Sequence, residues 1–113
     1  MRMWMVPPAE LCKKHLLGEH GELHKFLHNW AKHHKVDGRL AGNAMEPLSY
    51  KARHDALAAE MLFRRMNHGS PLDQPDFSYL PQGQREFRVD VEANRALLLG
   101  RCEFCRQLAG ANQ

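Results

Sequence analysis

The feature that most constrains the fold is an apolar repeat at helical spacing in the first third of the chain. Between Ala9 and Lys35, apolar residues recur three, four or seven positions apart, as they do on one face of an α-helix. We therefore predict a long first helix from residue 9 to about residue 35. Its apolar stripe consists of Leu16, Leu23, Leu27 and Trp30, with His20 set inside it.

Prolines separate this helix from the first residues and introduce a second helix. Pro7 and Pro8 fix the backbone, so residues 1–8 are expected to form a short extended arm. After Pro47, a second helix is expected from about Ser49, its N-cap, to about residue 66. Tyr50, Leu57 and Met61 share one face of this helix, and Ala52, Ala56, Ala59 and Phe63 share another, so we expect burial on two sides.

A third helix follows a long irregular connection. Residues 67–86 contain three prolines and no apolar period, and they are expected to pack irregularly on the helices. Asp90 is the expected N-cap of the third helix, and residues 109–113 are expected to fray. The sequence thus predicts one compact all-α domain, residues 1–113, with three main helices. The inner face of the third helix is formed by Val91, Leu98, Cys102, Cys105 and Leu108.

Composition and charge narrow the class of protein. The chain has 113 residues, 43% of them hydrophobic and 26% charged, which fits one ordinary globular domain. A net charge of +3 permits an anionic partner without requiring one. On charge alone, a solvated mixed-charge surface is the better explanation. No apolar run approaches the ~20 residues that cross a bilayer. Pro7 and Pro8 also interrupt the apolar start, so it fails as a signal peptide.

The cysteines bear on the compartment and on metal binding. Three is an odd number, which argues against a disulfide framework and favours a cytoplasmic protein, with no membrane association and no evident obligate protein partner. Cys102 and Cys105 form a CxxC pair, which is half of a structural zinc site, but the only other cysteine is Cys12. His24 and His28 have a chelating spacing without an HExxH motif. We expect no metal and no cofactor; a small zinc-stabilised interaction protein is the alternative.

An active-site floor is indicated by the polar residues beside the first apolar stripe. His15 and Glu22 are seven positions apart, close to two helical turns, so they share a face with Glu19 between them. A helix that only builds a core does not normally place two carboxylates and several histidines there. Gly18 and Gly21 cost the helix ~1 kcal/mol each relative to alanine, which suggests a close approach to its backbone.

No side-chain nucleophile has a recognisable local motif, which leaves the α-amino group of Met1. The reference pKa of an α-amino group is ~7.7–8.0, so roughly a tenth of it is neutral at pH 7. A neutral amine can attack an aldehyde-like carbon and form a Schiff base, and a nearby carboxylate can move protons or stabilise the cation. Because Arg2 is large, we expect Met1 to be retained.

Two blocks of the sequence resemble the pyrimidine-dimer DNA glycosylase family of the phage endonuclease V type, in its short bacterial form. The likeness covers residues 1–72 and reaches the third helix only by position. The blocks are Met1-Arg2 with His15-Leu16-Leu17-Gly18-Glu19-His20-Gly21-Glu22-Leu23, and Arg53-His54-Asp55-Ala56-Leu57-Ala58-Ala59-Glu60-Met61 with Arg64, Asn67 and His68-Gly69-Ser70-Pro71-Leu72.

The resemblance implies a compact helical enzyme that is both a DNA glycosylase and an apurinic/apyrimidinic lyase. It implies that the amine of Met1 attacks sugar C1′, that β-elimination then cuts the strand, and that Glu22 is the catalytic carboxylate. It further assigns His15 to the active site, Arg2 beside the nucleophile and Lys25 to DNA. The chain departs from the family at Gly21, where the phage enzyme has a DNA-binding arginine, at Arg65, which replaces a glycine, and at its C-terminus, which lacks the aromatic residues.

Basic residues on several predicted helices are candidates for phosphate contacts with double-stranded, damaged DNA. Such contacts bind with little sequence preference and strong salt dependence. An exposed, solvated face explains each lysine about equally well, and a non-catalytic DNA-binding helical module is the alternative to an enzyme. The predicted DNA-binding residues are Arg2, Lys14, Lys25, Arg64 and Arg101.

Overall fold

The structure is a computed structural model that describes residues 1–111. Within this range it contains helices and loops but no strand, which confirms the predicted all-α class. No helix in the described range is long and apolar enough to cross a membrane. The elements are η1 (Pro8–Glu10), α1 (Lys13–Lys25), α2 (Leu27–Ala31), α3 (Asp37–Ala41), η2 (Pro47–Ser49), α4 (Tyr50–Phe63), α5 (Gln82–Arg85), α6 (Val91–Arg101) and α7 (Glu103–Ala111).

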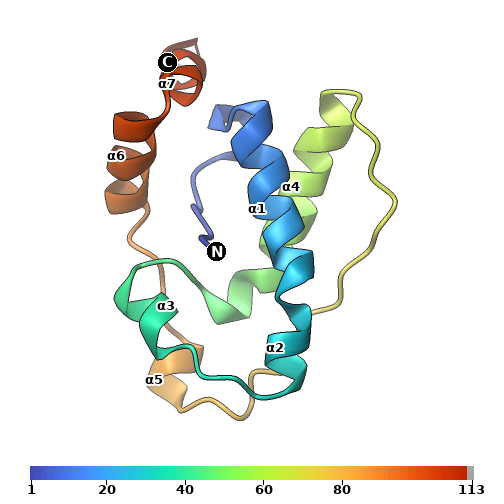
Figure 1. The fold of residues 1–113 in the computed structure, drawn as a ribbon, viewed down its shortest axis with the longest axis vertical. Helices are drawn as coiled ribbons and strands as arrows, with labels where there is room; N and C mark the ends of the chain where they lie inside the picture. Colours follow the sequence, from blue (N-terminus) through green and yellow to red (C-terminus); the bar gives the residue numbers. More distant parts are fainter. Residues whose placement is uncertain (112–113) are drawn as a thin grey trace.

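Helices α1 and α4 lie side by side and form one half of the molecule (Figure 1). Leu16 and Leu23 of α1 and Leu57 of α4 are fully buried between them. The Tyr50 hydroxyl donates a hydrogen bond of 2.5 Å to the carbonyl of Leu23, so a polar contact also joins the two helices. Helices α6 and α7 lie on the other side of the N-terminal arm, whose first residue lies near the middle of the molecule (Figure 1).

The first helix is shorter than the periodicity predicts. Helix α1 ends at Lys25, and after Phe26 the chain forms the short helix α2, which ends at Ala31. His33 then adopts φ 59°, a left-handed conformation that terminates helices. Trp30, at the end of the predicted stripe, is nevertheless buried in the core. The predicted apolar face is therefore buried on both sides of the break at Phe26.

The third helix is divided in two. Cys102 has an extended backbone, with φ −126° and ψ 109°, so α6 ends at Arg101 and α7 begins at Glu103. The predicted cap at Asp90 is confirmed, since its side chain accepts a hydrogen bond of 3.1 Å from the amide of Ala93. Residues 109–111, which we expected to fray, are the last turn of α7, and residues 112–113 lie outside the described part.

Other sequence expectations were wrong in detail. Ser49 precedes α4, but its hydroxyl donates to Glu46 instead of capping the helix. Two short helices, α3 and α5, lie in segments where no period was found. The second apolar face of α4 is not buried, because Phe63 is 83% exposed. Short helices and solvent-facing alanines give too weak a periodic signal for a pattern to place them.

Candidate active site

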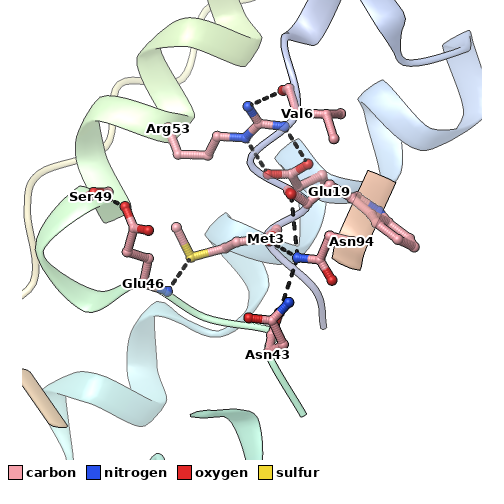
Figure 2. Close-up of polar contacts among 9 residues, drawn as sticks. Met3, Val6, Glu19, Asn43, Glu46, Ser49, Arg53 and Asn94 are labelled. Carbon is pink, nitrogen blue, oxygen red and sulfur yellow. Dashed lines mark hydrogen bonds and ion pairs between the residues drawn. The ribbon is translucent and has the colours of Figure 1, made fainter. Parts of the chain in front are cut away.

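The N-terminal arm is held by backbone and side-chain groups of residues that are distant in sequence. The amide of Met3 donates to the carbonyl of Ala44 at 2.8 Å. The Asn94 side-chain amide of α6 lies 3.3 Å from the carbonyl oxygens of both Met3 and Trp4, and Arg53 of α4 donates to the carbonyl of Val6 at 2.7 Å. Figure 2 shows the contacts that Arg53 and Asn94 make with the arm. They fix the backbone that leads to Met1.

The arm places the amine of Met1 against α1. Its nitrogen lies 3.2 Å from Glu22 Oε2, an ion pair between the first residue and the last turn of the helix. That oxygen is itself buried and makes no hydrogen bond with the described residues, although the Glu22 side chain as a whole is 41% exposed. The structure therefore brings together the two groups that the resemblance implies for catalysis.

A cleft of about 480 Å³ opens beside this pair. Its lining combines the Met1 amine and three cationic side chains with two carboxylates, so positive charge is in excess, which suits an anionic ligand. At Gly18, an added Cβ would meet no atom within 4 Å, so the glycine leaves the helix backbone open in the wall of the cleft. The lining residues are Met1, Arg2, Trp4, Lys14, His15, Gly18, Glu19, Glu22 and Arg101.

Glu19 differs from Glu22 in its surroundings, although it lies one turn away and borders the same cleft. Its carboxylate is buried and accepts two hydrogen bonds from Arg53, with Nε at 2.5 Å and Nη2 at 2.9 Å. Burial raises the pKa of Glu19, and the Arg53 guanidinium opposes that rise. The pair joins α1 to α4 (Figure 2), so Glu19 serves the architecture of the cleft.

His15 lines the cleft but has sulfur neighbours. Its Nδ1 lies 3.2 Å from Cys12 Sγ and 3.6 Å from Cys105 Sγ. Its ring meets that of Trp4 edge-on, with ring centroids 5.9 Å apart. Burial, followed by the nearby charge of Lys14, lowers the pKa of His15, so the ring is neutral at pH 7. The predicted site histidine is therefore in the wall of the cleft, with one nitrogen turned towards the cysteines.

Of the predicted DNA-binding residues, three line the cleft and two do not. Arg2, Lys14 and Arg101 belong to the lining, and Arg2 also donates to Asn94 Oδ1 at 2.8 Å. Arg64 instead donates to the carbonyl oxygens of Pro8 and Leu11, at 3.1 and 2.6 Å, and so fastens the start of the first helix. Lys25 is exposed at the end of α1, with its amine 5.7 Å from the centroid of the Phe26 ring.

Sequence reasoning missed two residues that build this site. Trp4 lines the cleft, and Asn94 holds both the arm and Arg2. Neither residue belongs to a motif with local spacing, and Asn94 is about 90 positions from the arm that it contacts. Only the tertiary structure joins them to the site.

Comparison with known proteins agrees with the geometry. The sequence model of the family described as pyrimidine dimer DNA glycosylase matches residues 1–74, which is more than half of the chain and includes the arm, α1 and α4. Curated proteins and solved structures give no match. The matched segment supplies both Met1 and Glu22, whereas α6 and α7 lie outside it. The chain belongs to the pyrimidine dimer DNA glycosylase family.

Proposed function

We propose that this protein is a DNA glycosylase with apurinic/apyrimidinic lyase activity that acts on damaged double-stranded DNA, with the Met1 amine as nucleophile. The observation that carries the proposal is the distance of 3.2 Å between the Met1 nitrogen and Glu22 Oε2 beside an open, cation-lined cleft. The proposal requires that Met1 be the first residue of the mature chain. Pyrimidine dimers are the substrate that the family description supports.

In the first reaction, the neutral amine attacks C1′ of the damaged nucleotide. The bond between C1′ and the base breaks, and the base leaves with the electron pair and takes up a proton. The attached nitrogen loses a proton to give an aminal. The C1′–O4′ bond of the sugar ring then breaks, with O4′ taking up a proton, and leaves a C1′ iminium, the protonated form of the imine. Glu22 is placed to accept a proton from the amine and to stabilise the cationic iminium.

In the second reaction, the iminium makes the neighbouring C2′ hydrogen acidic. Removal of that proton forms a C1′–C2′ enamine, and elimination breaks the C3′–O bond, with the phosphate leaving on the 5′ end of the downstream strand. Water then hydrolyses the imine and regenerates the amine. Because Glu22 lies beside the same nitrogen, we assign it the proton transfers of this step as well.

Phosphate binding is assigned to the cationic residues of the cleft. Arg2, Lys14 and Arg101 surround the amine from the arm, α1 and α6. A nucleotide must leave the base stack for C1′ to reach an amine at the floor of such a cleft. Lys25 extends the basic surface along α1, while the contacts of Arg64 with Pro8 and Leu11 favour a role in anchoring the arm.

Strand cutting on matched duplexes tests this function. Abasic, ultraviolet-irradiated and undamaged duplexes are incubated with the wild type, Glu22→Gln and the exposed control Glu86→Gln. We expect Glu22→Gln to cut abasic and irradiated DNA at least about 100-fold more slowly, because proton transfer typically contributes that much or more. The control should match the wild type, and undamaged DNA should stay intact.

A second variant tests the nucleophile in the same assay. Extra residues placed before Met1 move the amine away from Glu22 and should abolish cutting while leaving the helical circular dichroism unchanged. Cutting at the wild-type rate by both the extended chain and Glu22→Gln would refute this mechanism. Binding of abasic DNA by the wild type without any cutting would leave a DNA-binding module. Cutting of abasic but not irradiated DNA would refute the glycosylase step alone.

A further inference from the structure

Three cysteines and one histidine, from the two ends of the chain, converge at the junction of α1 with α7. Cys12 immediately precedes α1, and His15 lies in its first turn; Cys102 is the break between α6 and α7, and Cys105 lies in the first turn of α7. Their ligand atoms all lie within 4.8 Å of one another. All three cysteines are free and buried. Two half-motifs, CxxH and CxxC, therefore meet in space.

The spacing of these atoms is that of a tetrahedral zinc site. Zinc bonds of ~2.3 Å to sulfur and ~2.0–2.1 Å to nitrogen give tetrahedron edges of about 3.7 Å between sulfurs and about 3.5 Å between sulfur and nitrogen. Cys12 Sγ lies 3.7 Å from Cys102 Sγ, and His15 Nδ1 lies 3.2 and 3.6 Å from the sulfurs of Cys12 and Cys105. These distances fit one ion at the centre.

The backbone also supports thiolates at this place. The amide of Cys12 donates to Cys105 Sγ at 3.3 Å, and the amide of Cys105 donates to Cys102 Sγ at 3.4 Å. Donors of this kind orient and stabilise metal-bound sulfur. Buried thiolates without a cation would be costly, because isolated charges are strongly disfavoured away from water. The extended conformation of Cys102 places its sulfur in the cluster at the expense of a continuous helix.

We propose that Cys12, His15, Cys102 and Cys105 bind one zinc ion as a structural site. Four protein ligands close the coordination sphere, which distinguishes a structural from a catalytic zinc. The ion ties α6 and α7, which lie outside the segment that the family model matches, to the start of α1. Through His15 it also fixes part of the wall of the catalytic cleft.

Metal analysis of untagged protein, purified with reductant and without chelator, tests the proposal. The wild type should contain zinc with sulfur ligands in its X-ray absorption spectrum. Cys102→Ser and Cys105→Ser should each lose one equivalent of zinc and the sulfur scattering, while the exposed control His28→Ala keeps both. Unchanged sulfur ligation in both cysteine variants, or a wild type with three free thiols and no bound zinc, would overturn the proposal.

Cobalt substitution of the wild type covers the case in which the cysteine variants do not fold. Wild-type protein stripped of metal and loaded with Co²⁺ should show thiolate-to-cobalt charge-transfer absorption and the visible bands of a tetrahedral ion. Their absence after stoichiometric loading would count against the site.

A separate cluster of four histidines joins α1 to α4. His20 and His24 come from α1, His54 from α4 and His68 from the segment that follows it, and one nitrogen of each lies within 4.8 Å of the others. The Nε2 atoms of His24 and His54 are 3.0 Å apart, those of His20 and His68 2.8 Å, and those of His54 and His68 3.3 Å. Zinc–nitrogen bonds of ~2.0–2.1 Å give tetrahedron edges of about 3.3–3.4 Å.

The outer nitrogen of one of these rings is held as in metal sites. His54 Nδ1 lies 2.9 Å from Asp55 Oδ1, and a carboxylate accepts, so the proton of His54 is on Nδ1 and Nε2 presents its lone pair to the cluster. A carboxylate or backbone carbonyl on the outer nitrogen is the usual support of a metal-bound imidazole.

The geometry points to a second closed metal site, formed by His20, His24, His54 and His68, for a divalent ion that prefers imidazole, with zinc as the probe. An ion at the centre would take the lone pairs of the four facing Nε2 atoms, of which that of His54 carries no proton. The sequence placed His20 in the core and paired His24 with His28; the structure instead pairs His24 with three other histidines, and His28 is exposed.

The second site is tested in the same metal analysis by His68→Ala, because His68 lies outside the helices. We expect loss of one equivalent of zinc with nitrogen-only ligation, while the sulfur-ligated equivalent remains. His28→Ala should keep both equivalents. If His68→Ala and a second variant, His20→Ala, keep the wild-type zinc content, or if His68 Nε2 carries a proton in the zinc-loaded wild type by nitrogen NMR, the four-histidine site is refuted.

Discussion

Glu19 and Glu22 are one helical turn apart on α1 and have different physical roles. Glu22 borders the cleft and pairs with the amine of Met1, so its carboxylate is available to a substrate. Glu19 is buried and takes two hydrogen bonds from Arg53, which also holds the carbonyl of Val6. We therefore assign Glu22 to the proposed chemistry and Glu19 to the structure of the cleft.

Removing Arg53 should be far more costly than removing an exposed lysine. Arg53→Met leaves the Glu19 carboxylate buried without its partner, and we expect a loss of about 3–5 kcal/mol in the free energy of unfolding. Lys51→Met, which breaks an exposed pair with Asp55, should cost about 0–1 kcal/mol. Urea denaturation measures both, and the double variant Arg53→Met/Glu19→Leu should recover much of the loss. Equal effects of the two single variants would contradict this account of the pair.

Tyr50 should make stability depend on alkaline pH. Burial raises the pKa of Tyr50 from 10.0 to about 12. In its neutral form the hydroxyl donates a hydrogen bond to the carbonyl of Leu23 inside the core. The neutral form is thus favoured in the folded state. Its stabilising contribution is complete below pH 10 and is lost as the pH rises towards about 12. Absorbance titration of wild type and Tyr50→Phe identifies its ionisation, and a Tyr50 transition at pH 10 in folded protein would be the contrary result.

At the scale of elements, the N-terminal arm is positioned by side chains and not by regular secondary structure. Asn94 is 1% exposed and contacts the carbonyl oxygens of Met3, Trp4 and Asn43 while accepting from Arg2. One residue of α6 thus determines where the arm, and with it the amine, lies on α1. The arm belongs to the segment that the family model matches, but its position depends on α6, which lies outside that segment.

Asn94→Ala should therefore weaken both stability and activity. The variant removes the donor that Asn94 supplies to the buried carbonyl groups of Met3 and Trp4, and each unsatisfied buried group costs about 1–3 kcal/mol. We expect a lower urea midpoint and slower cutting of abasic DNA than for Asn67→Ala, an exposed control. Wild-type values for Asn94→Ala in both measurements would show that the arm is held independently of α6.

The elements show how far the sequence alone predicts this molecule. Apolar periodicity correctly placed the cores of α1, α4 and α6, because those helices are long and half-buried. It failed at Phe26 and Cys102, where tertiary contacts end a helix that the local pattern would continue. Local spacing also identified the CxxC pair, Cys102 and Cys105. The CxxH spacing of Cys12 and His15 was also visible in the sequence and could have supplied the other two ligands of the proposed zinc site.

At the scale of the whole molecule, cations from three separate segments surround one cleft. Arg2 comes from the arm, Lys14 from α1 and Arg101 from the end of α6, although the net charge is only +3. Charge that is modest in total but gathered at one place favours a polyanion at that place. The fold therefore gathers positive side chains at one cleft, and the net charge of the sequence does not reveal this clustering.

Arg101→Ala should reduce the salt dependence of DNA binding. If Arg101 contacts one phosphate, its loss lowers the magnitude of the slope of log K against log salt by about 0.9. Arg106→Ala removes the same charge from an exposed position of α7 outside the cleft and should change the slope much less. Fluorescence anisotropy with one abasic duplex at several salt concentrations gives both slopes, and equal slopes for the two variants would place the DNA elsewhere.

The central claim is that the amine of Met1, paired with Glu22, is the nucleophile. Borohydride reduction of the wild type on abasic duplex DNA, followed by digestion and mass spectrometry of the cross-linked peptide, tests it most directly. The account predicts a covalent adduct on the α-nitrogen of Met1. An adduct on a lysine such as Lys14, or no adduct under conditions where the strand is cut, would contradict it.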